Sequence, residues 1–356
     1  MTMAPTLATA PVSLPPEEAL APRGGPAALE SGSFAVGVIG TGNMGGGMAA
    51  NLLAQGWPVH VHDVDPAKLT YFIKNGAVGH ANAAQVAMQC IALIVCVVDD
   101  AQTASVLFGD GVDGAGAAAH LKPGSTVLLC PTIAPEAVEA FAQRLAELGV
   151  HCIDAPMSGG PARARDGSMS LMLAAPDAVM AANEALLVAL SHRRFHVSQR
   201  PGDGARTKLV NNLLAGINLV GAAEALAMAQ GMGLDLATTL DVIEQSSGQS
   251  WIGSDRMRRV LAHGGAGDYA PRAHMTLLAK DTRLAVAAAQ AAGFTGPLGT
   301  QASAVFVAAC EAGLAGEDDA ALFKLLSPPP GHPVSQRISD ALASGGDTPS
   351  GGQRPA

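Results

Sequence analysis

The chain has 356 residues, of which 49% are hydrophobic and 14% are charged. This composition excludes a chain that is disordered throughout, because such chains combine low hydrophobicity with high net charge. The net charge of −9 and the aromatic content of 3% argue against a nucleic-acid partner, since nucleic-acid binding relies on basic surfaces and on stacking aromatic rings. The length fits about two domains.

Cysteine spacing and hydropathy narrow the class of protein further. The five cysteines include no pair with CxxC spacing, so we expect free thiols, a reducing compartment and no bound metal. The best candidate for a membrane span, 209–223, has 15 uncharged residues including three asparagines, whereas a span needs about 20 mostly apolar residues. The N-terminus lacks the basic start and apolar run of a signal peptide. We therefore expect a soluble, cytoplasmic protein with no membrane partner.

The middle of the chain differs from its ends. Residues 1–33 and 327–356 lack apolar periodicity, and we expect both to be disordered tails. Between them, short apolar runs rich in β-branched residues alternate with helical stretches such as 135–148. Such runs are typical of strands buried on both faces of a parallel sheet. The expected strands are 35–40, 59–63, 92–98, 126–130, 151–154, 168–173 and 195–197.

This alternation predicts a doubly wound, mostly parallel α/β sheet of the Rossmann type over 34–200. After Gly204 the pattern changes, and 205–232 contains no proline. It predicts one helix of about 28 residues, roughly 42 Å long, that leads into an all-α domain over 201–326. The further expected helices are 235–246, 250–262, 273–292, 297–313 and 318–326.

A glycine-rich turn follows the first expected strand. Gly40, Gly42 and Gly45 form a GxGxxG pattern, in which glycines permit a tight turn, approach to a pyrophosphate and close packing of the next helix. The second strand ends at Asp63, and an acidic residue there binds ribose hydroxyls and repels a 2′-phosphate, so NAD is expected rather than NADP. The alternative is a purely structural turn. The predicted cofactor-binding residues here are Gly40, Thr41, Gly42, Asn43, Met44, Gly45 and Asp63.

Three further motifs follow in order. Asp154-Ala-Pro-Met-Ser158-Gly159-Gly160 ends a strand, Gly202-Asp-Gly204-Ala-Arg-Thr-Lys208-Leu-Val-Asn211-Asn212 opens the long helix, and Lys280-Asp281 lies in a later helix. With the glycine-rich turn, they resemble the β-hydroxyacid dehydrogenases, the group that includes 3-hydroxyisobutyrate dehydrogenase. The resemblance covers 34–326. Within the family, Leu121-Lys-Pro-Gly124 and Gly316-Glu-Asp-Asp319 are most similar to the L-threonate dehydrogenases and their sugar-acid relatives.

The chemistry of Lys208 can also be argued from the residue itself. An alcohol that is oxidised by hydride transfer must lose its hydroxyl proton, which requires a general base. A partly buried lysine suits this role, because desolvation lowers the pKa of an ammonium group. The resemblance makes Lys208 the catalytic lysine; the alternative is an ordinary exposed lysine. Asn212 lies one helical turn later on the same face and is predicted to hold the substrate and orient the lysine.

The resemblance implies further binding residues. Ser158, Gly159 and Gly160 would bind the substrate carboxylate through a hydroxyl and backbone N–H groups; the alternative is a simple turn at the end of a strand. The other cofactor-binding residues that it implies are Val98, Thr132 and Lys280. For Lys280 the alternative is a solvated charge on a helix.

The predicted function is therefore the NAD-dependent oxidation of a small hydroxy acid of the 3-hydroxyisobutyrate or threonate type. Lys208 would act as general base while a hydride passes to the nicotinamide. Two alternatives remain open: a non-catalytic NAD(P)-binding protein of the same fold, and an imine or semialdehyde reductase. Family members commonly associate through the all-α domain, so the resemblance also implies a homodimer or homotetramer.

Overall fold

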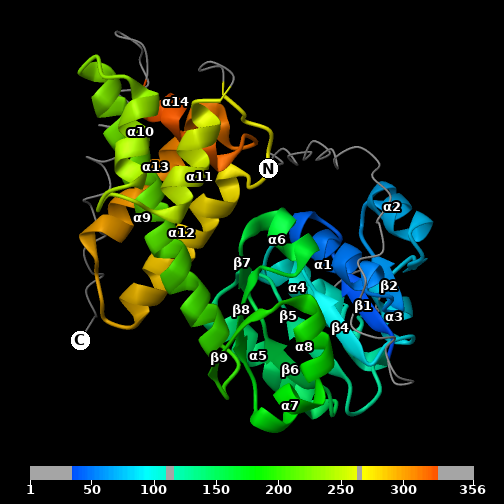
Figure 1. Ribbon diagram of the computed structural model, residues 1–356. Helices are drawn as coiled ribbons and strands as arrows, with labels where there is room; N and C mark the ends of the chain where they lie inside the picture. Colours follow the sequence, from blue (N-terminus) through cyan, green and yellow to red (C-terminus); the bar gives the residue numbers. More distant parts are fainter. Residues whose placement is uncertain (1–33, 110–115, 263–266, 328–356) are drawn as a thin grey trace, which may run out of the picture. The chain divides into compact units, whose positions relative to one another are not determined.

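The computed structural model describes residues 34–109, 116–262 and 267–327 (Figure 1). Apart from Ser327, the two expected tails lie outside the described residues. The chain divides by its internal contacts into an N-terminal unit that ends at Leu209 and a C-terminal unit that begins at Val210. The domain boundary expected near residue 200 lies just before a long helix, and the first two turns of that helix belong to the N-terminal unit.

The N-terminal unit contains a nine-stranded sheet with the order β3-β2-β1-β4-β5-β6-β8-β7, and β9 pairs with β8. Strands β1 to β6 run parallel, whereas β8 is antiparallel to β6 and β7. The doubly wound, mostly parallel sheet is thereby confirmed. The strands are β1 (Val36–Ile39), β2 (Val59–His62), β3 (Val78–Gly79), β4 (Ala92–Val95), β5 (Thr126–Leu129), β6 (His151–Asp154), β7 (Met157–Ser158), β8 (Ser170–Ala174) and β9 (Arg193–Ser198).

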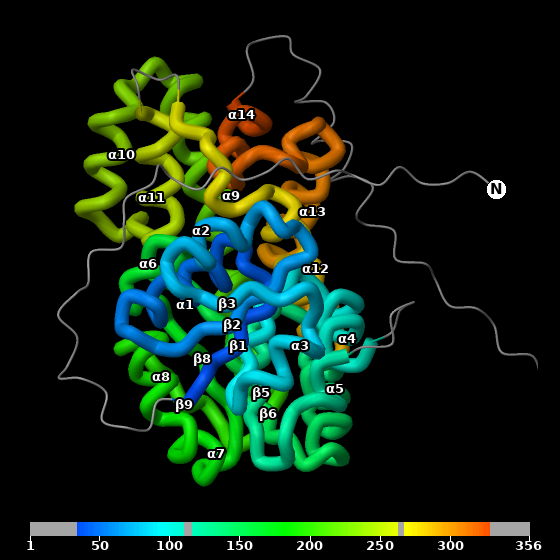
Figure 2. Tube along the Cα trace, turned by 90° about the vertical axis from the view of Figure 1, so that its right-hand side faces the viewer, coloured from blue at the N-terminus to red at the C-terminus, as the bar shows by residue number. Residues whose placement is uncertain are grey.

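The central strands β1 and β4 are apolar throughout because helices cover both faces of the sheet (Figure 2). In β4, Ile94 packs on the side of α1, whereas Leu93 and Val95 pack on the side of α5. Helices α1, α2, α6, α7 and α8 contribute to the first core, and α3, α4 and α5 to the second. These helices are α1 (Asn43–Ala54), α2 (Leu69–Lys74), α3 (Ala83–Ala87), α4 (Asp100–Phe108), α5 (Pro135–Glu147), α6 (Gly160–Asp166), α7 (Asp177–Ala182) and α8 (Glu184–Leu190).

The C-terminal unit is helical around a separate core that includes Leu219, Leu226 and Phe306. The all-α character of this part of the chain is confirmed, as is the long helix that leads into it. Its helices are α9 (Asp203–Gly231), α10 (Leu236–Glu244), α11 (Trp251–Val260), α12 (Met275–Ala291), α13 (Pro297–Ala309) and α14 (Leu322–Leu326).

Two helices expected in this unit are not α-helical throughout. The helix expected over 297–313 is α13 up to Ala309 and continues as a π-helical turn over Cys310–Leu314, inside which Gly313 has a φ of +94°. The segment expected as one helix over 318–326 is a 3-10 turn followed by the short α14. The side chain of Asp318 caps that turn by accepting the backbone N–H of Ala320.

Helix α9 is long and apolar enough to cross a membrane by length and composition alone. Its most apolar 18-residue window has a mean hydropathy of 1.4, and 39% of that window is buried. The sequence argument that this apolar run is too short therefore does not hold. Buried helices of globular proteins meet the same criterion, and Leu219 and Leu226 of α9 lie fully buried in the core of the C-terminal unit.

Candidate active site

The turn between β1 and α1 gives its three glycines different geometries. Gly40 has a φ of +86°, and a Cβ atom there would lie 2.4 Å from the carbonyl oxygen of Cys96. A Cβ atom at Gly45 would lie 1.9 Å from the carbonyl oxygen of Gly40, so only glycine lets α1 pack this closely. A Cβ atom at Gly42 would meet nothing within 4 Å, and no side chain caps α1 there. Open space beside a helix N-terminus fits a pyrophosphate.

Asp63 directly follows β2 and is held by this turn. Its Oδ2 accepts the backbone N–H of Thr41 at 2.8 Å and the Thr41 hydroxyl at 3.2 Å. Its Oδ1 accepts the backbone N–H of Asp65 at 3.0 Å, and the ammonium of Lys68 lies 3.5 Å away. A fixed negative charge therefore lies beside the glycine-rich turn. Lys68 adds a cation at this edge that the sequence argument did not consider.

Val98 and Thr132 follow β4 and β5. Because β1, β4 and β5 are adjacent and parallel, the residues after their carboxyl ends lie at the same edge of the sheet as Gly40. Thr132 is half-buried, and Val98 is exposed. Val64, which follows Asp63, is 92% exposed.

Ser158 is the last residue of β7 and begins the serine loop (158–160), whose two glycines require their residue type. Gly159 and Gly160 have φ values of +134° and +78°, which side chains with a Cβ rarely adopt. Helix α6 begins in this loop and packs closely on α1: a Cβ atom at Gly47 would lie 2.7 Å from the Cβ of Ala164. Small residues at 47 and 164 thus fix the serine loop to the helix that follows the glycine-rich turn.

Lys208 lies in the second turn of α9 with only 7% of its surface exposed, unlike an ordinary exposed lysine. Asp154, the last residue of β6, anchors the start of this helix. Its Oδ2 accepts the backbone N–H groups of Gly202 at 2.8 Å and Ala205 at 2.9 Å. Burial raises the pKa of Asp154 to about 6, although the backbone N–H groups that it accepts oppose this shift. A buried carboxylate therefore fixes the backbone one turn before Lys208.

Asn212 and Lys280 come together in the C-terminal unit through Asp281 of α12. The Nδ2 of Asn212 donates to Oδ2 of Asp281 at 2.7 Å, and the Oδ1 of Asn212 accepts from Nδ2 of Asn211 at 3.1 Å. The ammonium of Lys280 lies 3.0 Å from Oδ1 of Asp281. Asn212 and Asp281 are both buried. One carboxylate therefore contacts two residues that the sequence placed at different parts of the site.

The predicted residues thus form two groups, one in each unit. The N-terminal unit holds the glycine-rich turn, Asp63, the serine loop and Lys208, and the C-terminal unit holds Asn212 and Lys280. Asp154 and Asp281 were missed as site residues, although both lie in motifs that the sequence shows. The signals were an acidic residue that ends a buried strand and an acidic residue beside a lysine in an apolar helix.

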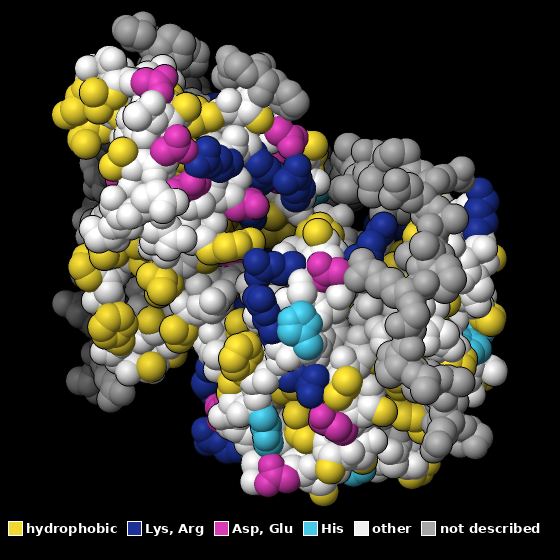
Figure 3. Space-filling view, in the orientation of Figure 1, with side chains coloured by type: hydrophobic (Ala, Val, Ile, Leu, Met, Phe, Trp, Pro, Cys, Tyr) yellow, Lys and Arg dark blue, Asp and Glu magenta, His cyan; other side chains and the backbone are white. Residues whose placement is uncertain are grey.

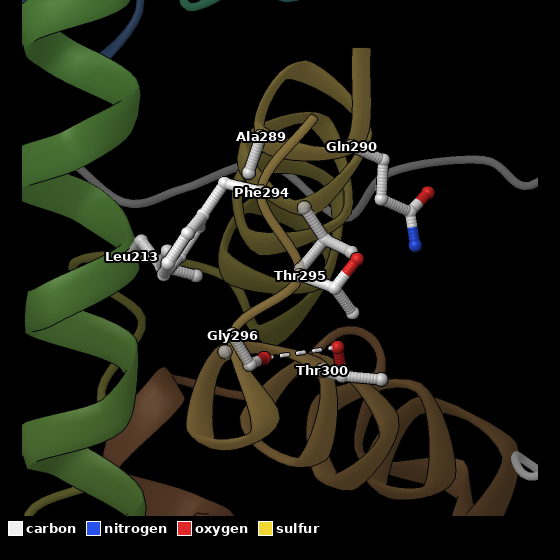
Figure 4. Close-up of a pocket in the computed structure, with 9 residues that line it drawn as sticks. Leu213, Ala289, Gln290, Phe294, Thr295, Gly296 and Thr300 are labelled. Atoms are coloured by element: carbon white, nitrogen blue, oxygen red, sulfur yellow. Dashed lines mark hydrogen bonds between the residues drawn. The ribbon is translucent and has the colours of Figure 1, made fainter. Parts of the chain in front are cut away.

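Other features lie apart from these groups. A small apolar pocket is lined by residues that include Leu213 of α9 and Phe294, whose side chains approach each other (Figure 4). None of the predicted site residues lines this pocket.

Over the described ranges, no three His, Cys, Asp or Glu side chains are grouped so as to hold a metal ion. The five cysteines are free, as predicted. Hydrophobic side chains also reach the surface of the helical unit (Figure 3), among them Val210, Leu214 and Met228.

Two protein-family models match nearly all of the described chain. Residues 35–198 match the NAD-binding domain of 6-phosphogluconate dehydrogenase. Residues 202–326 match the NAD-binding domain of NADP-dependent 3-hydroxyisobutyrate dehydrogenase. The boundary between the two matches falls in the turn just before α9.

Relatives with assigned activities cover the same region. L-threonate dehydrogenase of Cupriavidus necator is 37% identical over 82% of this chain and 95% of its own length. 3-Hydroxyisobutyrate dehydrogenase of Pseudomonas aeruginosa is 36% identical over 75% of this chain and 89% of its own length.

Solved structures also match this chain. The crystal structure of 3-hydroxyisobutyrate dehydrogenase from Salmonella typhimurium superimposes with a TM-score of 0.75 at 34% identity, covering 82% of this chain and 99% of that one. Psf3, solved in complex with NADP+, superimposes with a TM-score of 0.74 at 28% identity, covering 82% of this chain and 100% of that one. The glycine-rich turn with its open space at Gly42 fits the NAD(P) binding that these matches imply. The chain therefore belongs to the β-hydroxyacid dehydrogenase family, as its motifs predicted, and is an NAD(P)-dependent hydroxyacid dehydrogenase.

Proposed function

We propose that this protein oxidises a small hydroxy acid of the threonate or 3-hydroxyisobutyrate type with NAD, using Lys208 as the general base. The names of the two relatives above support the substrate class. The observation that carries the proposal is the burial of Lys208 one turn after the anchor formed by Asp154. A buried lysine on an anchored helix, in the same unit as the glycine-rich turn, suits proton transfer rather than solvation.

Each of the predicted site residues has its own role in this reaction. The hydroxyl of Ser158 and the backbone N–H groups of the glycines after it bind the substrate carboxylate. The Nζ of Lys208 accepts the proton of the reacting hydroxyl, and in the reverse direction the ammonium returns it. Asn212, one turn later on α9, holds the substrate. The bound nicotinamide supplies the hydride acceptor.

The preference for NAD rests on Asp63. Three donors already hold its carboxylate in place, so its charge cannot easily turn away from a 2′-phosphate. Lys68 offsets part of this repulsion from 3.5 Å. NAD is thus the preferred cofactor, and NADP is accepted more weakly.

We also propose that the helical unit forms the interface of a homo-oligomer. Val210, Leu214 and Met228 of α9 are 71%, 58% and 61% exposed, and large apolar side chains exposed along one helix are typical of interfaces between subunits. Light scattering coupled to gel filtration tests this proposal. A monomer at micromolar concentration would contradict it.

The function is tested by following the absorbance of NADH over a panel of acids, each with NAD and with NADP. The panel contains 3-hydroxyisobutyrate, L-threonate, D-threonate, glycerate, L-serine and 4-hydroxybutyrate. We expect one acid of the threonate or 3-hydroxyisobutyrate type to react with the highest kcat/KM, and NAD to exceed NADP. Tight NAD binding without turnover of any acid in the panel would contradict the proposed substrate class.

A further inference from the structure

We propose that Asp281 is a positioning residue that fixes the side-chain amide of Asn212, so that its carbonyl oxygen and not its NH2 group faces the substrate. The proposal rests on the function proposed above, which places Asn212 against the substrate. It is carried by the hydrogen bond from Nδ2 of Asn212 to Oδ2 of Asp281 at 2.7 Å.

The chemistry of the partners determines the orientation of the amide. An ionised carboxylate only accepts hydrogen bonds, so it must face the NH2 group of the asparagine. A rotated amide would place two acceptor oxygens together in a buried position, since Asn212 and Asp281 are each 8% exposed. Such a contact is costly where water cannot replace the lost bond.

The carbonyl oxygen of Asn212 is left as an acceptor with spare capacity. It accepts one hydrogen bond from Nδ2 of Asn211 at 3.1 Å, and a carbonyl oxygen has two lone pairs. The second lone pair suits a hydroxyl donor. The orientation of Asn212 therefore favours a substrate that offers a hydroxyl group, and a rotated amide would instead offer NH2 donors.

Lys280 completes this arrangement. Its ammonium lies 3.0 Å from Oδ1 of Asp281 and supplies the opposite charge that a buried carboxylate needs. Asp281 thus links Lys280, which the family resemblance places at the cofactor, with Asn212, which its helical spacing from Lys208 places at the substrate. Asp281 itself acts through these two neighbours.

The test is a double-mutant cycle with Asp281→Asn and Asn212→Ala. The new amide at 281 cannot accept from both neighbours, because one of its two ends is an NH2 group that faces a donor. We expect Asp281→Asn to lower kcat/KM for the hydroxy acid by about tenfold to a hundredfold. In the Asn212→Ala background the same change should have little further effect on the KM for the acid. If the double variant instead lost activity by the product of the two single losses, the two residues would act independently and the proposal would be overturned.

Asp319→Asn is the matched control. Asp319 is another buried carboxylate of the C-terminal unit and pairs with Arg256 at 2.6 Å. We expect this control to lower the melting temperature while kcat/KM of the folded enzyme stays near the wild-type value. An equal loss of kcat/KM in both variants would show that Asp281 acts through general stability.

A second readout does not depend on turnover. In protein labelled with 15N in its asparagine side chains, the Asn212 NH2 signal, assigned by its loss in Asn212→Ala, should exchange slowly with solvent in the wild type and rapidly in Asp281→Asn. Unchanged exchange in Asp281→Asn would overturn the positioning role even if no acid in the panel is oxidised. A wild type with slow exchange but no turnover would contradict only the proposed function.

Discussion

Asp154, at the carboxyl end of β6, accepts the backbone N–H of Ala205 in the first turn of α9 at 2.9 Å, and the same oxygen accepts the N–H of Gly202. A buried carboxylate thereby joins the sheet to the helix that contains Lys208. Because Asp154 begins the segment that leads to Ser158, the anchor of the lysine and the serine loop are adjacent along the chain.

This anchor predicts different outcomes for two substitutions. Asp154→Ala leaves two buried N–H groups without an acceptor, at a cost of about 1–3 kcal/mol each, and we expect kcat to fall because the backbone before Lys208 is no longer fixed. Asp154→Asn keeps an accepting oxygen and should retain most of the stability. Denaturation in guanidinium chloride together with kcat measures both effects. Equal stability of Asp154→Ala and the wild type would contradict the anchoring role.

The raised pKa of Asp154 also predicts a pH dependence. The folded protein keeps this carboxyl protonated up to about pH 6, whereas its ordinary pKa is 3.8. Between these values the unfolded chain binds fewer protons, so the contribution of the group to stability falls as the pH rises and is constant above about pH 6.

Relative to Asp154→Asn, the free energy of unfolding of the wild type should therefore fall by up to about 3 kcal/mol between about pH 4 and pH 7. Denaturation curves of both proteins at several pH values measure this difference. A difference that does not change with pH would show that the carboxyl titrates normally in the folded protein.

Lys208→Ala should lower kcat by about 10²–10⁴-fold and leave the Kd for NAD nearly unchanged, because only the proton transfer is lost. Lys208→Arg keeps the positive charge but cannot release a proton near neutral pH, so it should be similarly slow. Steady-state kinetics and NAD titration by fluorescence measure the two quantities. Wild-type turnover in Lys208→Arg would rule out a general base at this position.

The glycines of the first turn should respond differently to alanine. A Cβ atom at Gly45 collides with the carbonyl oxygen of Gly40, whereas a Cβ atom at Gly42 enters open space. Gly45→Ala should therefore lower the melting temperature of the protein without cofactor. Gly42→Ala should keep that melting temperature but weaken NAD binding by about tenfold or more, since the methyl group occupies the space for the pyrophosphate. Unchanged NAD affinity in Gly42→Ala would place the pyrophosphate elsewhere.

Asp63 and Lys68 should change cofactor preference in opposite directions. Asp63→Asn keeps an acceptor for Thr41 but removes the charge, so the ratio of kcat/KM for NAD over NADP should fall by roughly tenfold. Lys68→Ala removes the nearby cation and should raise the same ratio. Asp65→Asn, two residues beyond Asp63, serves as the control. The same ratio in the wild type and in all three variants would show that this edge does not select the cofactor.

The Rossmann strands could be predicted closely because burial on both faces leaves an unbroken apolar run. The strand expected at 35–40 is observed as Val36–Ile39, in which every residue is buried. In contrast, β3 and β7 are two residues long, which is too short to show any periodicity. Their pairing depends on neighbouring strands, so nothing local in the sequence marked them.

In the site, too, features within one short segment could be predicted, whereas contacts between distant residues could not. The glycine-rich turn is contiguous, and the geometry of its glycines follows from the pattern itself. The hydrogen bond that Ala205 donates to Asp154 and the one that Asn212 donates to Asp281 join residues 51 and 69 positions apart. A single sequence gives no sign of which distant residues will meet, so both aspartates were missed.

The contact between Gly47 and Ala164 restricts how this sequence can change. Both positions must stay small together, although one lies in the helix behind the cofactor turn and the other follows the substrate loop. A bulkier residue at 47 would push α6 away and displace Ser158, without touching any ligand. We therefore expect substitutions at Gly47 to impair recognition of the acid, so that a position in a cofactor-binding helix limits the range of substrates.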